Sequence, residues 1–383
     1  MLRKASRLAA FGSFLIVILA AAGASAAPDA RAVADALVAA FGASGKAVAT
    51  YDNAVADGDT ITITGFKAVQ PKRSDRVITV ASIVVAGAAE RQPGGFTANS
   101  MTFTDGSLSD KEGSAKWQTA VVTNAVVPTP EEIRGLSNKV MPFSTASMSG
   151  IAVTAPDLAQ PIDIAKVDLS MAADDKGEPN SVTFATTGIH LPASAFDAPE
   201  VQGVMQGLGY TDLVLAASFD VGFDSGTDKL DLRSLALDIT DVGKLEISGA
   251  FSNVKVHSMV NDGTDATPAP KTTPNLDALT IRFNNAGIVE RALDMQAEIL
   301  GASREDVAAQ WPMALMFLMG DVGGMDFQQK VQTAVTTFLQ SPKSMTVTMA
   351  PAAPVSFDAV VDTMKQDQAK LPDLLAVGIS VNN

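Results

Sequence analysis

Hydrophobic residues alternate with polar or small ones over long stretches of this chain, and this period of two most constrains its fold. Successive side chains of a β-strand point to opposite faces, so such a pattern predicts strands with one buried face. The clearest stretch has its apolar positions at Leu213, Leu215, Ala217, Phe219, Val221 and Phe223. Turn residues follow at 224–228, and two further alternating stretches end at Phe251. We therefore expect a three-stranded antiparallel meander over 213–251.

A phase slip in this alternation recurs and indicates bent strands. Apolar residues fall at positions i, i+2, i+5 and i+7 in the stretches 78–85, 96–103, 162–169 and 230–237. One extra residue in a strand, a β-bulge, restores the same face to the core and bends the strand. Chance recurrence of common aliphatic residues is the alternative interpretation. The bulge interpretation predicts a curved antiparallel β-sheet, shaped as a half-barrel, a trough or a sandwich.

Helical periodicity is confined to a few segments, most of them in the last third of the chain. Short helices are predicted at 28–41, 130–139 and 196–208, and longer ones at 288–299, 304–317 and 327–339, before a strand at 345–349. Ser303 and Asp306 have the spacing of a capping box, and Pro312 should kink the helix that follows. The predicted fold class is α+β, a curved antiparallel sheet with an α-rich C-terminal third.

The domain organisation expected from these patterns has four parts. Residues 1–26 form a signal peptide, and residues 27–260 form a β-dominated region with short helices. Residues 261–274, which combine Asn, Asp, Gly, Thr and Pro without periodicity, form a loop or linker. Residues 275–383 form an α-rich C-terminal region, which is either a separate domain or packed on the same sheet.

The first 26 residues indicate export. Three cations, Arg3, Lys4 and Arg7, precede an apolar run of about ten residues, and the segment ends on Ala24-Ser25-Ala26. The apolar run is too short to cross the ~30 Å hydrocarbon core of a bilayer. We therefore expect Sec-type export, cleavage after Ala26, a periplasmic location and no permanent transmembrane span. Because the chain has no Cys, it forms no disulfide, and a large core has to stabilise it.

Charge and composition exclude several classes of partner. The chain has 28 Lys and Arg against 42 Asp and Glu, a net charge of −14. Cleavage after residue 26 removes three cations and no acid, which leaves 25 cations against 42 acids, a net charge of −17. A surface this acidic repels nucleic acid and anionic headgroups. Only two Trp and two Tyr are present, too few for stacking against sugars or bases.

Few residues are arranged for catalysis or metal binding. His190 and His257 are the only histidines, and no Gly-x-Ser-x-Gly sequence accompanies them, so no nucleophilic triad is predicted. The two histidines also lack the close spacing of a zinc site. The acidic stretches 105–112, 224–231 and 261–265 fit hairpin turns better than a calcium-binding loop. We therefore predict a protein that is not an enzyme, with no cofactor and no metal site.

Four methionines, Met313, Met316, Met319 and Met325, lie close together in the sequence. Flexible thioether side chains line hydrophobic binding sites, and they also fill irregular cores. We favour core filling, because the segment lacks a polar face. Copper binding by thioethers is a third interpretation, which the lack of a nearby His weakens.

The long amphipathic strands over 213–251, with 60–66 and 97–103 in the same style, resemble those of the AsmA-like and YdgA-like exported envelope proteins. The resemblance is one of pattern over part of the chain and includes no specific motif. The chain departs from many members in that no obvious retained membrane anchor is expected from its sequence. The resemblance implies a role in outer-envelope maintenance or lipid handling through a β-sheet trough, without catalysis.

Two functions follow from these observations. The first is a non-enzymatic periplasmic envelope protein that binds lipid or another apolar ligand through the curved sheet. Its candidate ligand-facing residues are Leu213, Leu215, Phe219, Val221 and Phe223. The alternative is a structural or protein-interaction component of the cell envelope, whose acidic exterior meets another envelope protein and which has no small-molecule ligand.

Overall fold

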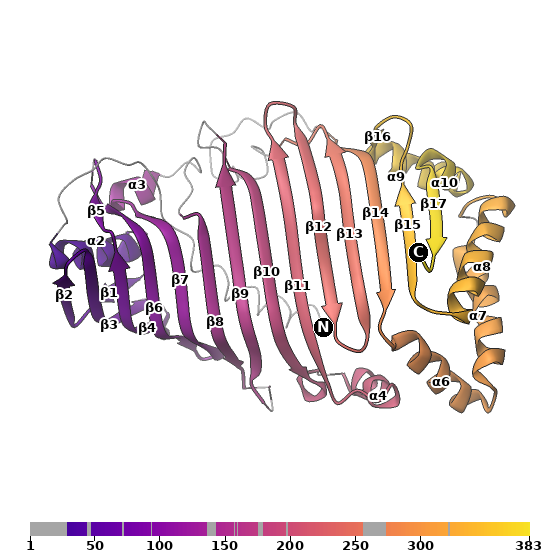
Figure 1. The fold of residues 1–383 in the computed structure, drawn as a ribbon, viewed down its shortest axis with the longest axis horizontal. Coiled ribbons are helices and arrows are strands. Elements are labelled where there is room, and N and C mark those ends of the chain that lie inside the picture. Colours follow the sequence, from indigo (N-terminus) through magenta and orange to yellow (C-terminus); the bar gives the residue numbers. More distant parts are fainter. Residues whose placement is uncertain are drawn as a thin grey trace. The chain divides into compact units, whose positions relative to one another are not determined.

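The computed structural model describes residues 29–43, 47–70, 73–92, 94–135, 143–156, 158, 160–174, 179–196, 198–255, 273–320 and 322–383. The chain divides into two compact units, residues 1–197 (unit 1) and residues 198–383 (unit 2). Each unit is described by itself. Figure 1 labels the elements.

Unit 1 is dominated by strands. Its described elements are helices α2 (Ala30–Gly42) and α3 (Pro130–Gly135), the 3-10 helix η1 (Ala193–Ala195), and strands β1 (Val48–Thr50), β2 (Asn53–Asp57), β3 (Thr60–Gln70), β4 (Arg73–Ala86), β5 (Ala89–Glu90), β6 (Phe96–Asp110), β7 (Gly113–Val127), β8 (Thr145–Thr154), β9 (Ile162–Ala173) and β10 (Pro179–Pro192). Strands β3, β4, β6, β7, β8, β9 and β10 pair in that order, all antiparallel. The short strands β1 and β2 both pair with β3, and β5 pairs with β6.

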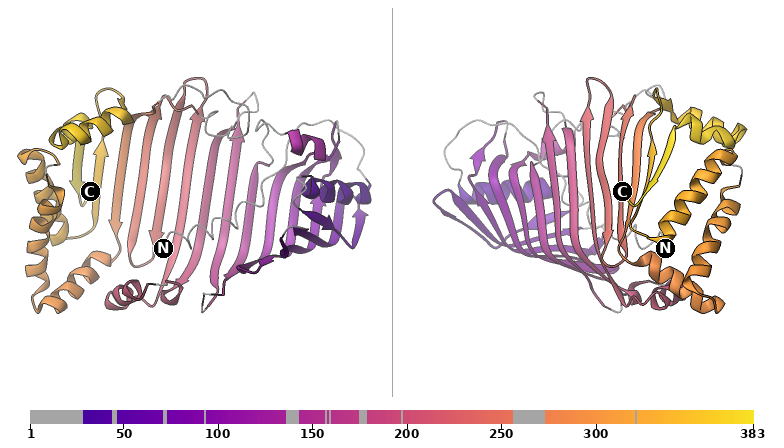
Figure 2. Two further views of the ribbon diagram at one scale, coloured as in Figure 1. Left: turned by 180° about the vertical axis from the view of Figure 1, so that it is seen from behind. Right: turned by 45° about the vertical axis from the view of Figure 1, so that its right-hand side comes forward.

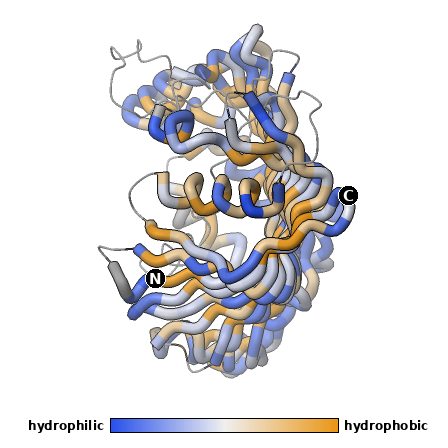
Figure 3. The backbone as a smooth tube through the Cα atoms, turned by 90° about the vertical axis from the view of Figure 1, so that its left-hand side faces the viewer, coloured by the Kyte–Doolittle hydropathy of each residue, from blue (hydrophilic) through white to orange (hydrophobic). Residues whose placement is uncertain are grey.

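The core of unit 1 lies between α2 and one face of this sheet. Val33, Leu37 and their alanine neighbours are spaced to place one stripe of the helix inward, and they are buried. Against them pack alternate residues of the strands, among them the fully buried Ile63, Ile83 and Met101. Figure 3, in which this end of unit 1 faces the viewer, shows α2 beside the strands.

A line of left-handed residues crosses the sheet of unit 1 and accounts for its phase slips. Gly65, Asp105, Gly150 and Gly188 have φ values of 66°, 49°, 62° and 63°. The registers on either side place these four residues in one row, with Ala81, Gln118 and Ala165 on the intervening strands. Every second strand of the row therefore has a left-handed residue. We call this line the left-handed row.

Across the left-handed row, buried side chains are three residues apart instead of two. In β3 they are Ile63 and Phe66, and in β4 they are Val80 and Ile83. The register is the same on both sides of the row, so neither strand contains an inserted residue. The sequence expectation of an inserted residue in the stretches 78–85, 96–103 and 162–169 is therefore wrong. In 96–103 the slip lies opposite another left-handed residue, Asn124 (φ 49°).

The fourth predicted bulge is confirmed. In β12 the register shifts against both neighbours, between Asp220 and Val221 of β11 and between Leu232 and Leu235 of β12 itself. Within this interval, β12 has one residue more than each of its partner strands. The stretch 230–237 therefore contains the inserted residue that its pattern predicts.

Unit 2 combines a sheet with helices. Its described elements are helices α4 (Pro199–Gly207), α6 (Ile288–Leu300), α7 (Arg304–Met319), α8 (Met325–Gln340), α9 (Phe357–Gln366) and α10 (Leu371–Leu374), the 3-10 helix η2 (Gln368–Lys370), and strands β11 (Asp212–Asp224), β12 (Lys229–Ile239), β13 (Gly243–Ser252), β14 (Asn275–Asn285), β15 (Ser344–Met349), β16 (Val355–Ser356) and β17 (Val377–Val381). Strands β11, β12, β13, β14, β15 and β17 pair in that order, all antiparallel, and β16 pairs with β14.

The predicted antiparallel meander is β11, β12 and β13, and the predicted helices are present. Helices α2, α3, α4, α6, α7 and α8 and strand β15 lie where the periodicity places them, with ends shifted by a few residues. Ser303 and Asp306 form the expected capping box, and α7 continues through Pro312 as one helix. The α+β class with a helical C-terminal part is therefore confirmed. The described strands do not close into a barrel in either unit.

The division between compact units differs in place from the expected linker. The units divide at residue 197, whereas the sequence pattern placed a loop or linker at 261–274. Strands β13 and β14 flank that segment and pair with each other, so it joins neighbouring strands of unit 2. Residues 256–272 and the expected signal peptide, 1–26, lie outside the described residues.

Substitution of Gly188 by Ala tests the left-handed row. A Cβ at Gly188 would lie 2.7 Å from the Cβ of Ala165, and the residue has a φ of 63°. We expect the free energy of unfolding to fall by about 1–3 kcal/mol, measured by urea denaturation. Gly203→Ala is the matched control, because a Cβ there meets nothing within 4 Å and the residue lies in helix α4. The control should be neutral or stabilising, and an equal loss in both variants would contradict the interpretation.

Candidate functional site

One face of the unit 2 sheet is apolar across its full width. Four cross-strand rows of directly paired residues make up this surface, which we call the apolar face. The rows are Ala217–Leu237–Leu245–Phe283–Met345–Val381, Phe219–Leu235–Ile247–Ile281–Val347–Ile379, Val221–Leu232–Gly249–Leu279–Met349–Val377 and Phe223–Leu230–Phe251–Leu276–Val355. None of these positions has an ionisable side chain. Paired side chains on one face lie within contact distance, so each row is a continuous apolar strip.

The residues that the sequence singled out all lie on β11. Phe219, Val221 and Phe223 are in the apolar face, each opposite a leucine of β12. Leu215 pairs with Ile239 one step beyond the four rows, and Leu213 shares the face by alternation. All five side chains are half-buried.

Helices α6 to α8 cover part of the apolar face, on β14, β15 and β17. Leu293 of α6, Val307 of α7 and Phe338 of α8 form a buried cluster against Phe283 and Met345. The rings of Phe283 and Phe338 meet edge to face, with 6.4 Å between their centroids. Figure 2 shows α7 and α8 beside the last strands of the sheet.

The part of the apolar face on β12 and β13 is partly solvent-exposed. Leu235, Leu237 and Leu245, on the neighbouring strands β12 and β13, are 44%, 39% and 38% exposed. A fully buried leucine is stabilised by about 1.5–3 kcal/mol relative to an exposed one, so these residues forgo much of that stabilisation. Contiguous exposed apolar residues of this kind are typical of interaction surfaces.

The opposite face of the same sheet is polar. Arg233 and Asp220 form an ion pair with an N–O distance of 3.1 Å, and Lys244 and Glu246 form another of 2.7 Å. The amide of Asn284 donates to Glu246 over 3.1 Å. Exposed ion pairs add little stability, so their main effect here is to keep this face hydrated. The two faces of the sheet therefore differ sharply in character.

Three strands of the apolar face, β14, β16 and β17, were missed by the sequence analysis, and β16 has only two residues, too few to show an alternation. Strand β17 contributes Val377, Ile379 and Val381, an alternation too short to stand out. Strand β14 begins irregularly, and its register shifts against β13 near Phe251, which interrupts the alternation. In β14 and β17 the alternation of apolar residues is present but short.

Two of the four methionines of α7 and α8 do not fill a core, contrary to the prediction. Met313 and Met325 are exposed, and Met325 is 87% exposed at the first position of α8. Met316 and Met319 are half-buried. The expectation of core filling is therefore wrong for Met313 and Met325. A hollow of about 640 Å³ lies between the start of α8 and α10, lined by apolar and charged side chains that include Met325, Lys330 and Asp373.

The described residues do not bring together three or more His, Asp or Glu side chains that could hold a metal ion. His190 lies on β10, where Asp163 of β9 is its paired residue. His257 lies outside the described residues. Within the described part of the chain, no helix is both long enough and apolar enough to cross a membrane.

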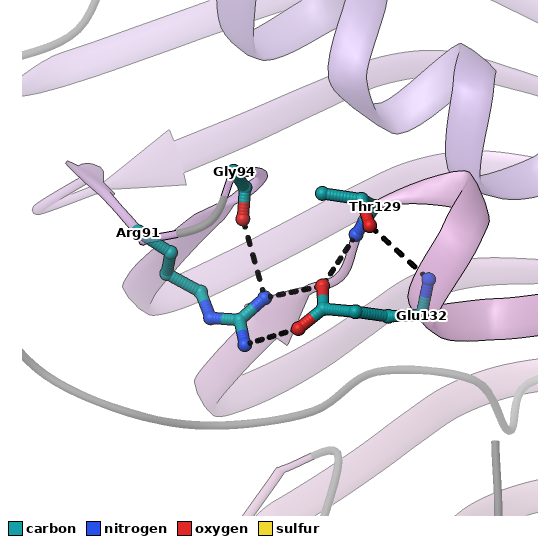
Figure 4. A network of polar contacts seen from close by, with 4 residues as sticks. All are labelled: Arg91, Gly94, Thr129 and Glu132. Carbon is teal, nitrogen blue, oxygen red and sulfur yellow. Dashed lines mark hydrogen bonds and ion pairs between the residues drawn. The ribbon is translucent and has the colours of Figure 1, made fainter. Parts of the chain in front are cut away.

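The ion pair between Arg91 and Glu132 in unit 1 has a structural role (Figure 4). Both guanidinium NH groups of Arg91, whose side chain is 4% exposed, donate to the carboxylate over 3.1 Å. The carboxylate also accepts from the backbone N–H of Thr129 (2.7 Å), whose hydroxyl accepts from the N–H of Glu132 (3.2 Å). These reciprocal bonds form a capping box for α3. The pKa of Glu132 is lowered below its ordinary value of 4.5, chiefly by the hydrogen bonds from Arg91.

Comparison with known proteins bears on unit 2 only. A protein family described as "Uncharacterized protein" matches residues 236–382. The matched segment runs from within β12 to the end of β17, and thus includes most of the apolar face and the helices that border it. Strand β11 lies outside the match. No curated protein matches the chain.

The Arg91–Glu132 pair should make stability depend on pH. Because the folded-state pKa of Glu132 is lowered, its contribution is present above pH 4.5 and is lost as the pH falls through the folded-state pKa. We expect Glu132→Gln to lower the free energy of unfolding by about 2 kcal/mol at pH 7. The difference from the wild-type protein should shrink toward zero in acid, as followed by urea denaturation at a series of pH values.

Glu131→Gln is the control for this prediction. Glu131 is the exposed neighbour of Glu132 and pairs only with the exposed Arg134 one turn away, over 2.7 Å. Its loss should change the free energy of unfolding by less than about 0.5 kcal/mol at any pH. An effect as large as that of Glu132→Gln would show that charge alone, and not the buried pair, determines the pH dependence.

Proposed function

We propose that this protein is a non-enzymatic protein of the bacterial cell envelope, which binds the acyl chains of a lipid, or another apolar ligand, on the apolar face of unit 2. The observation that carries the proposal is the exposure of Leu235, Leu237 and Leu245, which lie side by side in the first two of the four continuous apolar rows. A ligand laid across these residues would remove them from water and gain the hydrophobic free energy that folding leaves unused.

The dimensions of the apolar face fit an acyl chain. Six paired strands span roughly 24 Å in the hydrogen-bonding direction, and four rows span roughly 20 Å along the strands. One leaflet of a bilayer has acyl chains of about 15 Å, half of its hydrocarbon core. The whole face, including the part that α6 to α9 cover, is therefore longer than one acyl chain in either direction.

The chemistry of the apolar face favours a ligand without polar groups along its length. Its rows consist of aliphatic side chains, phenylalanine, methionine and one glycine. Such a surface offers dispersion contacts but no side-chain hydrogen bond or charge. It thus suits a hydrocarbon chain better than a peptide or a sugar, whose polar groups would lose their hydration.

We further propose that the sheets are curved, as the phase slips predict. The register shift in β12 supports a bend in unit 2, because a bulge bends its strand and increases the local twist. In unit 1 the left-handed row supports a bend, because its four left-handed residues change the backbone direction of every second strand at one level. A concave apolar face would enclose more of a bound chain than a flat one.

The proposal includes export of the protein to the periplasm. The basic start, the short apolar run and the Ala24-Ser25-Ala26 ending support a signal peptide that is cleaved after Ala26. An exported protein that binds lipid on an open surface would operate between the two membranes of the envelope. The alternative, a structural component that binds another envelope protein through the same face, is distinguished by the experiment below.

The test compares two apolar residues of equal exposure on opposite faces of the sheet. Leu237, on the apolar face, and Val214, on the polar face, are each 39% exposed. We expect the protein expressed with its leader to bind a fluorescent fatty acid, and Leu237→Asp to weaken this binding at least about tenfold, because a charge would be buried under the chain. Val214→Asp should leave binding unchanged.

Mass spectrometry of the purified protein provides an independent measurement. Lipid that co-purifies with the wild-type protein and with the Val214→Asp variant, but not with the Leu237→Asp variant, would support the proposal. Clean spectra and no fatty-acid uptake would contradict it. Isolation of a defined protein partner through Leu237, without lipid, would support the alternative.

A further inference from the structure

Helix α9 (Phe357–Gln366) presents an apolar stripe to solvent. Phe357, Val361 and Met364 are spaced by four and three residues, so they share one face of the helix. Their side chains are between 42% and 48% exposed, and no residue of the helix is buried. An exposed apolar stripe of this kind is typical of a surface that meets a partner.

The α9 stripe is continuous with the apolar face. The ring of Phe357 stacks on the ring of Phe251, with 6.3 Å between centroids and an interplanar angle of 21°. Phe251 belongs to the fourth row of the apolar face, and Val355, just before the helix, ends that row by pairing with Leu276. An acyl chain could therefore pass from α9 to the sheet without leaving an apolar surface.

The position of α9 is held firmly at its N-terminal end. The hydroxyl of Ser356 accepts from the N–H of Ala359 over 3.1 Å and caps the helix. The N–H of Phe357 donates to the carbonyl of Pro274 over 3.1 Å. The exposed stripe thus belongs to an ordered, anchored helix.

The charged residues beside the stripe indicate which kind of lipid surface it contacts. Asp358, Asp362 and Lys365 are exposed on the same helix, so its local charge is net negative. An anionic bilayer would be repelled by the two carboxylates and by the net charge of the chain. A zwitterionic headgroup contains both an ammonium group, which a carboxylate attracts, and a phosphate, which Lys365 attracts.

We propose that the α9 stripe contacts the surface of a zwitterionic phospholipid bilayer and is the place where an acyl chain passes between the bilayer and the apolar face. Contact with the bilayer is argued from α9 alone, whereas the passage of a chain rests on the proposed function. At about 1.5 Å per residue, ten helical residues extend over roughly 15 Å, enough to lie in the interface without spanning it.

Flotation with phosphatidylcholine vesicles tests the contact, with Met364→Asp as the variant. Met364 lies at the end of the stripe and makes no capping or pairing contact, so the fold should be retained. We expect the wild-type protein to float with the vesicles and the variant to bind roughly tenfold more weakly. Met325→Asp, which changes an exposed methionine on α8, is the matched control and should float like the wild-type protein. Equal loss in both variants, or no flotation of the wild-type protein, would overturn the inference.

A charge variant tests the choice of surface. Asp362→Lys should allow flotation with vesicles that contain phosphatidylglycerol, to which the wild-type protein should bind weakly. This gain should disappear at high salt, because it depends on exposed charges. Strong wild-type binding to the anionic vesicles would overturn the assignment of a zwitterionic surface.

A soluble probe separates this inference from the proposed function. Met364→Asp should keep its affinity for a fluorescent fatty acid, because that probe reaches the apolar face from water, whereas Leu237→Asp should lose it. Fatty-acid binding without vesicle binding would overturn only the inference about α9. Vesicle binding without fatty-acid binding would contradict the proposed function and leave the bilayer contact in place. A wild-type dimer that Met364→Asp converts to monomers, without vesicle binding, would assign the stripe to a second copy of the chain.

Discussion

Contact between side chains of directly paired residues on neighbouring strands is the interaction on which each unit depends. With a period of two along a strand and a constant register between strands, apolar residues line up in rows, and each row acts as one hydrophobic strip. In unit 1 these strips are covered by α2 and form a buried core. In unit 2 they are covered in part by α6 to α9 and partly exposed on β12 and β13. The same sequence pattern therefore produces a core in one unit and an open surface in the other.

Much of the fold could be predicted from the sequence because the alternation is long and the helices have clear limits. The meander of β11, β12 and β13, the capping box at Ser303 and the helices of the C-terminal part all follow from local periodicity. The physical origin of the phase slips could not be predicted in the same way. An inserted residue, as in β12, and a left-handed residue at the same level, as at Gly65, return the same face to the core and leave the same spacing. Only the register distinguishes them.

The candidate site could be predicted only in part. Alternation identified Phe219, Val221 and Phe223 as residues that share a face, and the pairing with β12 to β17 extends that face over six strands. Period-two spacing predicts which side chains point to the same face of a sheet, but it does not predict which elements pack on that face. The exposure of Leu235 depends on where α6 to α9 lie, which is a property of tertiary packing. For the same reason, the exposure of Met325 could not be recognised from its apolar neighbours.

The left-handed row has a consequence for how this chain tolerates changes of length. Its seven positions are aligned by register, so adding or deleting a single residue in one strand would move that strand's position out of line with both neighbours. The misaligned strand would also turn its apolar residues toward water beyond the point of change. Length variation among homologous chains should accordingly be confined to the hairpin loops, while the distance from each loop to the row is preserved.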